Sequence, residues 1–154
     1  MEMSFAALIF QGIPEMIAVA TLGFSMAKLD LAWRRIVIIG CAMGLLAFII
    51  RLLPVTFGVH TIVLLVMIII SLNKFGATHF VAIISGLLSF LTLVICETLV
   101  SLVIFGIFEL SPVVVAQNDF LKIITGIPEV LMIFLVSFLV LKFRRRGKNE
   151  LFKV

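Results

Sequence analysis

The chain has 154 residues, of which 64% are hydrophobic and 13% are charged, and its formal net charge is +4. Soluble domains contain about 45–50% apolar and about 25% charged residues, so this composition excludes a soluble globular protein. Apolar runs of about 20 residues are typical of transmembrane helices, whereas a membrane barrel would alternate apolar and polar residues. We therefore expect an all-α, polytopic integral membrane protein that forms a single transmembrane domain.

Five apolar runs predict five transmembrane helices along the chain. Each run ends at a charged cluster, a proline or a glycine-containing turn. The third run is short for a span, and the fourth is long enough to require a tilt, a break or a projection beyond the bilayer. The predicted spans cover about residues 4–29, 36–53, 57–73, 77–108 and 120–143, and a short basic tail, 144–154, follows them.

The basic residues predict the orientation of these spans. With five spans the termini lie on opposite sides. A cytoplasmic C-terminus then puts every lysine and arginine except Arg51 and Lys122 on the cytoplasmic side. This bias is the positive-inside pattern, so we expect an external N-terminus in a bacterial inner membrane. Because the basic residues lie at membrane edges, we expect contact with membrane lipid and no binding of nucleic acid.

One tetrapeptide, Gly-Ile-Pro-Glu, occurs at residues 12–15 and again at 126–129. Each copy lies inside an apolar run. A proline removes one i→i−4 hydrogen bond, so Pro14 and Pro128 predict helix kinks in the first and fifth spans. The simpler alternative is that Pro-Glu begins each helix, with the carboxylate near the positive end of the helix dipole.

The ionisable residues inside the spans fall at a similar height. At about 1.5 Å per residue, Glu15 and Glu129 lie about 20 Å above the cytoplasmic edge. His60, Arg51 and Glu97 lie at about 21, 24 and 27 Å. A charge at the membrane centre costs at least about 2.5–3.5 kcal/mol, so such groups normally face the bundle interior and pair. We therefore predict an outward-facing polar pocket that binds a ligand or forms an ion-pair cluster, with the arginine fork as its hub.

Two members of this predicted pocket have simpler interpretations. Arg51 can extend its charge to the outer surface, and His60, next to a turn, can cap a helix or lie at the interface. Glu97 is harder to explain in this way, because its sequence neighbours are apolar.

The sequence contains no motif of an enzyme. It lacks Gly-x-Ser-x-Gly, His-Glu-x-x-His, a phosphate loop and Cys-x-x-Cys. We therefore expect no catalytic residues, no cofactor and no metal site. The cysteines, Cys41 and Cys96, lie in apolar runs and should behave as small hydrophobic residues.

Small residues in two of the runs predict close helix packing and a homo-oligomer. One pair, Gly40 and Gly44, lies in the second span. The other set forms a small-residue face on the fourth span: Ala82, Ser85, Gly86 and Ser89.

The chain resembles the membrane-sensor regions of Agr-type histidine kinases from Gram-positive bacteria. The shared features are five spans, an external N-terminus, the first Gly-Ile-Pro-Glu and the run Arg51-Leu52-Leu53-Pro54-Val55-Thr56-Phe57-Gly58-Val59-His60. The resemblance implies an input module that binds an extracellular signal and passes a change inward through its last helix. From these residues we expect no kinase activity, since they include no dimerisation helix, phospho-acceptor histidine or ATP-binding domain.

Two functions fit these observations. The first is a stand-alone sensor or regulatory subunit that binds a small extracellular ligand or ion and acts on a separate signalling partner. The alternative is a small proton- or cation-coupled transporter or channel subunit working as an oligomer, because membrane carboxylates near arginine and histidine also suit ion coupling.

Overall fold

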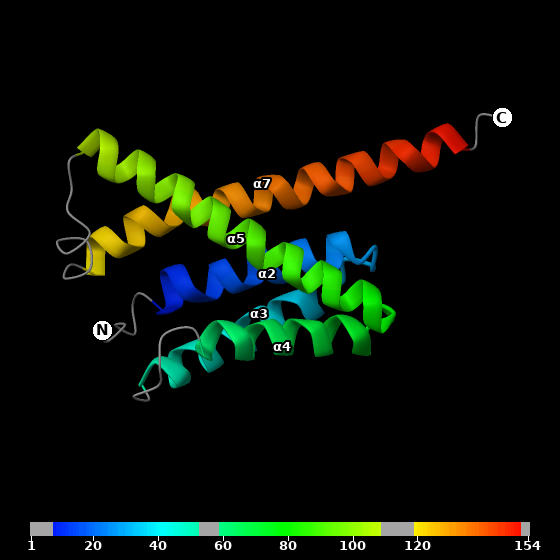
Figure 1. Ribbon diagram of the computed structural model, residues 1–154, viewed down its shortest axis with the longest axis horizontal. Helices are drawn as coiled ribbons and strands as arrows, with labels where there is room; N and C mark the ends of the chain where they lie inside the picture. Colours follow the sequence, from blue (N-terminus) through cyan, green and yellow to red (C-terminus); the bar gives the residue numbers. More distant parts are fainter. Residues whose placement is uncertain (1–7, 53–58, 109–118, 152–154) are drawn as a thin grey trace.

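The computed structural model describes residues 8–52, 59–108 and 119–151, and these form a bundle of helices (Figure 1). A π-helical turn, η1 (Leu8–Gly12), leads directly into α2 (Ile13–Met26). The prediction of an all-α protein with five helical segments is confirmed over the described residues. The remaining helices are α3 (Trp33–Leu52), α4 (Val59–Lys74), α5 (His79–Phe108) and α7 (Asp119–Leu151).

Four helical segments in the described part of the chain are long and apolar enough to cross a membrane. The helix α4 has 16 residues, which is about 24 Å and therefore shorter than a hydrocarbon core of about 30 Å. Residues 57 and 58, which would lengthen this span, lie outside the described residues. The four long segments are Leu8–Met26, Trp33–Ile50, His79–Ile104 and Ile123–Phe143.

The last helix is longer than the predicted fifth span. Its apolar part ends at Phe143, but α7 continues to Leu151 through most of the expected basic tail. The helix therefore joins the middle of the bundle to the basic end of the chain without a break.

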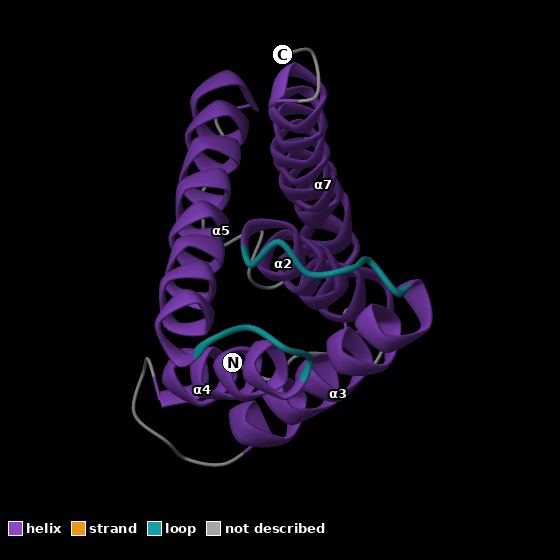
Figure 2. Ribbon diagram, turned by 90° about the vertical axis from the view of Figure 1, so that its right-hand side faces the viewer, coloured by secondary structure: helices purple, strands orange, loops and turns teal. Residues whose placement is uncertain are grey.

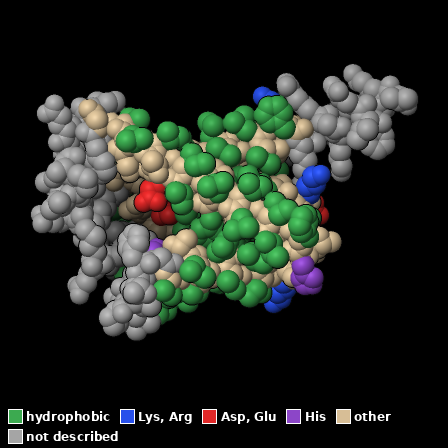
Figure 3. Space-filling model, viewed as in Figure 1, with side chains coloured by type: hydrophobic (Ala, Val, Ile, Leu, Met, Phe, Trp, Pro, Cys, Tyr) green, Lys and Arg blue, Asp and Glu red, His purple; other side chains and the backbone are tan. Residues whose placement is uncertain are grey.

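The helix α2 lies at the centre of the bundle, with α5 and α7 on one side and α3 and α4 on the other (Figure 2). Within Leu8–Met26, 56% of the residues are buried, against 22% within Ile123–Phe143. The surrounding helices expose large apolar side chains over most of the visible surface (Figure 3). Such a surface is expected where the surrounding medium is lipid, because the hydrophobic effect does not drive apolar residues inward there.

The glycine pair of the second span packs against α2 inside the chain. A Cβ on Gly40 would lie 2.5 Å from Cγ1 and 2.7 Å from Cα of Ile17. A Cβ on Gly44 would lie 3.0 Å from Cγ1 of Ile13. These two glycines therefore allow α3 to approach α2 closely. Their surface is already covered by a helix of the same chain.

The small-residue face of the fourth span is also internal. Ala82, Ser85, Gly86 and Ser89 are buried, and a Cβ on Gly86 would lie 2.8 Å from Ile69 Cγ1 of α4. Both surfaces that the sequence offered for association of two copies are thus used for packing between helices of the same chain. Self-association stays a prediction, but it would have to use another surface.

Two tight turns end helices at the same end of the bundle. Lys28 follows α2 with φ 58°, and Gly76 follows α4 with φ 108°. In both turns the next N–H donates back to the helix: Leu29 to the Phe24 carbonyl at 3.0 Å, and Ala77 to the Leu72 carbonyl at 3.1 Å. Glycine adopts this left-handed conformation readily, whereas a lysine is strained by its Cβ.

The two turns meet through aromatic side chains. The rings of Phe24 and Phe75 lie 5.7 Å apart, and the Arg35 guanidinium lies 5.2 Å from the Phe75 ring centre. Lys28 and Asp30 complete a small cavity of about 180 Å³ at this end. The contacts fix the loop after α2 against the loop after α4.

Candidate functional site

The second Gly-Ile-Pro-Glu lies inside α7, and its proline comes nine residues after the helix begins at Asp119. Pro128 therefore interrupts an established helix, and the helix-start alternative is wrong for this copy. The side chain of Glu129 is buried, with 7% of its surface exposed. Burial of a carboxylate at this position needs a close approach of neighbouring helices, and Gly126 provides one: its Cβ position lies 2.5 Å from Cγ of Gln11.

The first copy follows the π-helical turn. The α-helix α2 begins at Ile13, and both Pro14 and Glu15 lie in its first turn. Because helical backbone precedes this proline, the missing N–H falls within a continuous helical segment, and the wider π turn adjoins it. For this copy, the helix-start and the helix-interior interpretations are therefore both partly right. The α-helix α2 starts at the motif, but the π-helical turn η1 already precedes it.

Three glutamates from three helices come together in the structure. The carboxyl groups of Glu15 on α2 and Glu97 on α5 both interact electrostatically with that of Glu129 on α7. The helices themselves support this arrangement, since α2, α5 and α7 each pack against the other two. We call Glu15, Glu97 and Glu129 the carboxylate cluster.

The described lysine and arginine side chains lie far along the helices from the carboxylate cluster. They belong to the loop after α2, the first turn of α3, and the polar ends of α4 and α7. Figure 3 shows a group of acidic side chains toward the left of the molecule, and basic ones beside a further acidic side chain at the right-hand end. The carboxylate cluster is therefore separated from the basic residues along the bundle. The basic residues concerned are Lys28, Arg34, Arg35, Lys74 and Lys142.

The other two predicted pocket residues are placed less fully. Arg51 lies in the last turn of α3, but its side chain lies outside the described residues. His60 is half-buried in the first turn of α4, and its Nε2 lies 3.3 Å from Oγ1 of Thr61. Their membership of the pocket stays a prediction.

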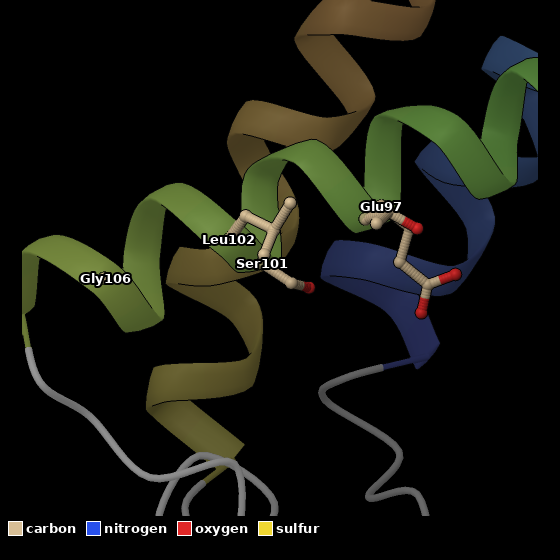
Figure 4. Close-up of a pocket in the computed structure, with 5 residues that line it drawn as sticks. Glu97, Ser101, Leu102 and Gly106 are labelled. Atoms are coloured by element: carbon tan, nitrogen blue, oxygen red, sulfur yellow. The ribbon is translucent and has the colours of Figure 1, made fainter.

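A groove runs along α5 beside the carboxylate cluster. It has a volume of about 520 Å³. Figure 4 shows the side chains of Glu97 and Ser101 pointing to the same side of α5. Spacing of four residues explains this, because residues i and i+4 share a helix face. The groove is lined by Glu97, Thr98, Ser101, Leu102 and Gly106.

Sequence reasoning missed three residues of this region. Gln11 precedes the first Gly-Ile-Pro-Glu and packs on Gly126. Cys96 is buried, and its thiol interacts electrostatically with Glu129. Ser101 lies one turn beyond Glu97. The helical spacing of Ser101 was readable from the sequence, whereas the other two depend on which helices become neighbours.

The described residues contain no group of three His, Cys, Asp or Glu side chains that could hold a metal ion. The three glutamates thus lie near one another without converging on one point. Comparison with models of protein families, with curated proteins and with solved structures gives no match. We therefore infer the function from the geometry of the site.

Proposed function

We propose that the chain is a five-span inner-membrane protein, with α4 as the third span, an external N-terminus and a cytoplasmic C-terminus. The distribution of its twelve basic residues supports this topology, since only Arg51 and Lys122 depart from it. The carboxylate cluster then lies in the outer half of the membrane. The groove extends from it toward the outer end of α5.

In this topology the protein is a stand-alone sensor or regulatory subunit that binds a small extracellular cation at the carboxylate cluster. The observation that carries the proposal is the burial of Glu129 next to two further carboxyl groups. A buried carboxyl group is either neutral through protonation or paired with a positive charge, and a cation at the cluster would supply that charge. Even with Arg51 in the cluster, one guanidinium would face three carboxylates, so the site favours additional positive charge.

The helix that carries Glu129 also offers a route for the signal. A cation that draws the three carboxylates together changes the packing of α7 against α2 and α5. The same helix continues to the basic end of the chain. A shift at the site therefore reaches the cytoplasmic side through one element, where a separate signalling partner would detect it.

A row of buried hydroxyl groups favours coupled transport as a second candidate. Thr21, Ser25, Ser89 and Ser137 are buried on the inner side of the carboxylate cluster. Each hydroxyl donates to the carbonyl four residues earlier in its helix, at 2.6–2.9 Å, so its oxygen keeps acceptor capacity. Cation flux into proteoliposomes that disappears in Glu97→Gln would support transport. Ligand-dependent association with a signalling protein and no flux would support sensing.

Cation binding itself is tested by thermal unfolding of the purified chain in detergent. The proposal predicts that at least one of sodium, potassium, magnesium and methylammonium raises the unfolding temperature, since a ligand that binds only the folded state stabilises it. The shift should disappear in Glu129→Gln. The matched control is Asp30→Asn, which removes an exposed carboxylate at the opposite end. A shift that survives in Glu129→Gln would contradict the proposed site.

A further inference from the structure

Two members of the carboxylate cluster lack a polar partner within the described residues. No hydrogen bond or ion pair is found there for Glu129 or Glu97. Glu129 is more than nine-tenths buried. Among the described residues, every fully buried side-chain oxygen has a hydrogen bond. Because none is found for Glu129, its carboxyl oxygens are not fully sealed, and a small donor that enters the cluster can reach them.

The arrangement does not suit a bare metal ion. A divalent cation needs several oxygen atoms converging at about 2–2.6 Å. The described residues contain no group of three Asp, Glu, His or Cys side chains that could hold a metal ion. A larger cation that donates hydrogen bonds in several directions is better matched to carboxyl groups that lie near one another without converging on one point. An ammonium group has this property.

The groove beside Glu97 offers room for the rest of such a molecule. Its lining residues from Glu97 to Gly106 span about 14 Å of helix. The Thr98 hydroxyl donates to the Val94 carbonyl at 2.7 Å, but no hydrogen bond from Ser101 is found among the described residues. Leu102 adds an apolar wall, and a Cβ on Gly106 would meet nothing within 4 Å. The groove is therefore partly apolar and has one available hydroxyl.

We propose that the carboxylate cluster and this groove together bind a small organic amine with an apolar substituent. The ammonium group lies between Glu129 and Glu97, and the substituent extends along α5 past Ser101 toward Gly106. The inference rests on the proposed cation-binding function and names its ligand class. Because each buried methylene raises affinity about fourfold, affinity should increase with the length of the substituent.

The test is protection of Glu129 from a hydrophobic carbodiimide in the full chain, reconstituted in nanodiscs. The modified peptide is quantified by mass spectrometry, and thermal unfolding in the same amine series gives a second measure of binding. The probes are methylammonium, butylammonium, neutral butanol, sodium and magnesium, at equal ionic strength. We expect butylammonium to protect at lower concentration than methylammonium, by about fourfold per added methylene. Butanol, sodium and magnesium should not protect.

A groove-filling variant, Gly106→Leu, tests where the substituent lies. Open space around Gly106 makes this change compatible with folding. It should weaken butylammonium binding about tenfold and leave methylammonium binding unchanged. The control, Leu91→Phe, enlarges an exposed residue of the same helix away from the groove and should change neither.

The possible failures are distinguishable. Equal binding of methylammonium and butylammonium, or equal protection by sodium, would overturn the organic-amine inference while leaving cation binding in place. Unchanged butylammonium binding in Gly106→Leu would overturn the assignment of the groove. If no cation protects Glu129 or shifts the unfolding temperature, the proposed function itself fails.

Discussion

Replacement of Gly40 by alanine tests the central packing of this fold. A Cβ at this position would lie 2.7 Å from Cα and 2.8 Å from N of Ile17, which are backbone atoms of α2. No side-chain rotation relieves such contacts. For ordinary contact at about 3.4 Å, α2 and α3 would have to separate by roughly 0.7 Å. We therefore expect Gly40→Ala to destabilise the protein.

The magnitude follows from two opposing effects. Overpacking of a close contact costs about 1–3 kcal/mol. Alanine recovers up to about 1 kcal/mol, because glycine is a poor helix former. The net loss at Gly40 therefore lies between about 0 and 3 kcal/mol, with about 1–2 kcal/mol at the middle of that range. At Gly106, where a Cβ meets nothing within 4 Å, only the gain applies, and Gly106→Ala should stabilise the protein by about 0.5–1 kcal/mol.

Reversible unfolding in mixed micelles, followed by circular dichroism, measures both variants against the unchanged chain. Opposite signs for the two alanines are the expected result. Equal changes of the same sign would refute the close approach of α3 to α2. A loss at Gly40 that grows with dilution of the protein would instead place this glycine between two copies of the chain.

Two further predictions concern the polar end of the bundle and use the same unfolding assay. Lys28→Gly should stabilise the protein by up to about 1 kcal/mol, because Lys28 has φ 58°. The control, Lys28→Ala, keeps a Cβ and should give no such gain. Equal gains in the two variants would show that the backbone at this position is not strained. Arg35→Leu should cost about 0.5–1 kcal/mol through loss of the contact with the Phe75 ring. Its neighbour Arg34 is also exposed, and an equal loss in Arg34→Leu would show that the ring contact contributes nothing.

The helices themselves were predictable from the sequence, because hydrophobic runs and charged clusters are local signals. The third span illustrates the limit of this approach. Its apolar run predicts a helix, and α4 forms, but its 16 residues do not establish a span by length alone. Packing partners are less predictable. A glycine pair such as Gly40 and Gly44 predicts close contact with some helix, but not whether that helix belongs to the same chain.

Helical rise predicts similar heights for Glu15, Glu97 and Glu129, since each helix runs along the bundle. It does not predict the rotation of these residues about the helix axes. The structure brings these three together but leaves Arg51 and His60 as predictions. Rotation depends on which face of each helix meets which neighbour, and for α7 that face is set by the contact between Gly126 and Gln11. A glutamine one residue before the first motif carries no signal by itself.

The two copies of Gly-Ile-Pro-Glu use the same residues in different ways to build one site. In the first copy, Gly12 and Ile13 contact Gly44 of α3. This contact positions the start of the central helix, α2, against α3. In the second, Gly126 admits the Gln11 side chain and draws α7 toward the start of α2. Since α2 and α7 run in the same direction, equal positions in the motif reach equal heights (Figure 1). Contacts near the prolines therefore hold together the two helices whose glutamates follow, and Glu129 interacts with both Glu15 and Glu97 of α5.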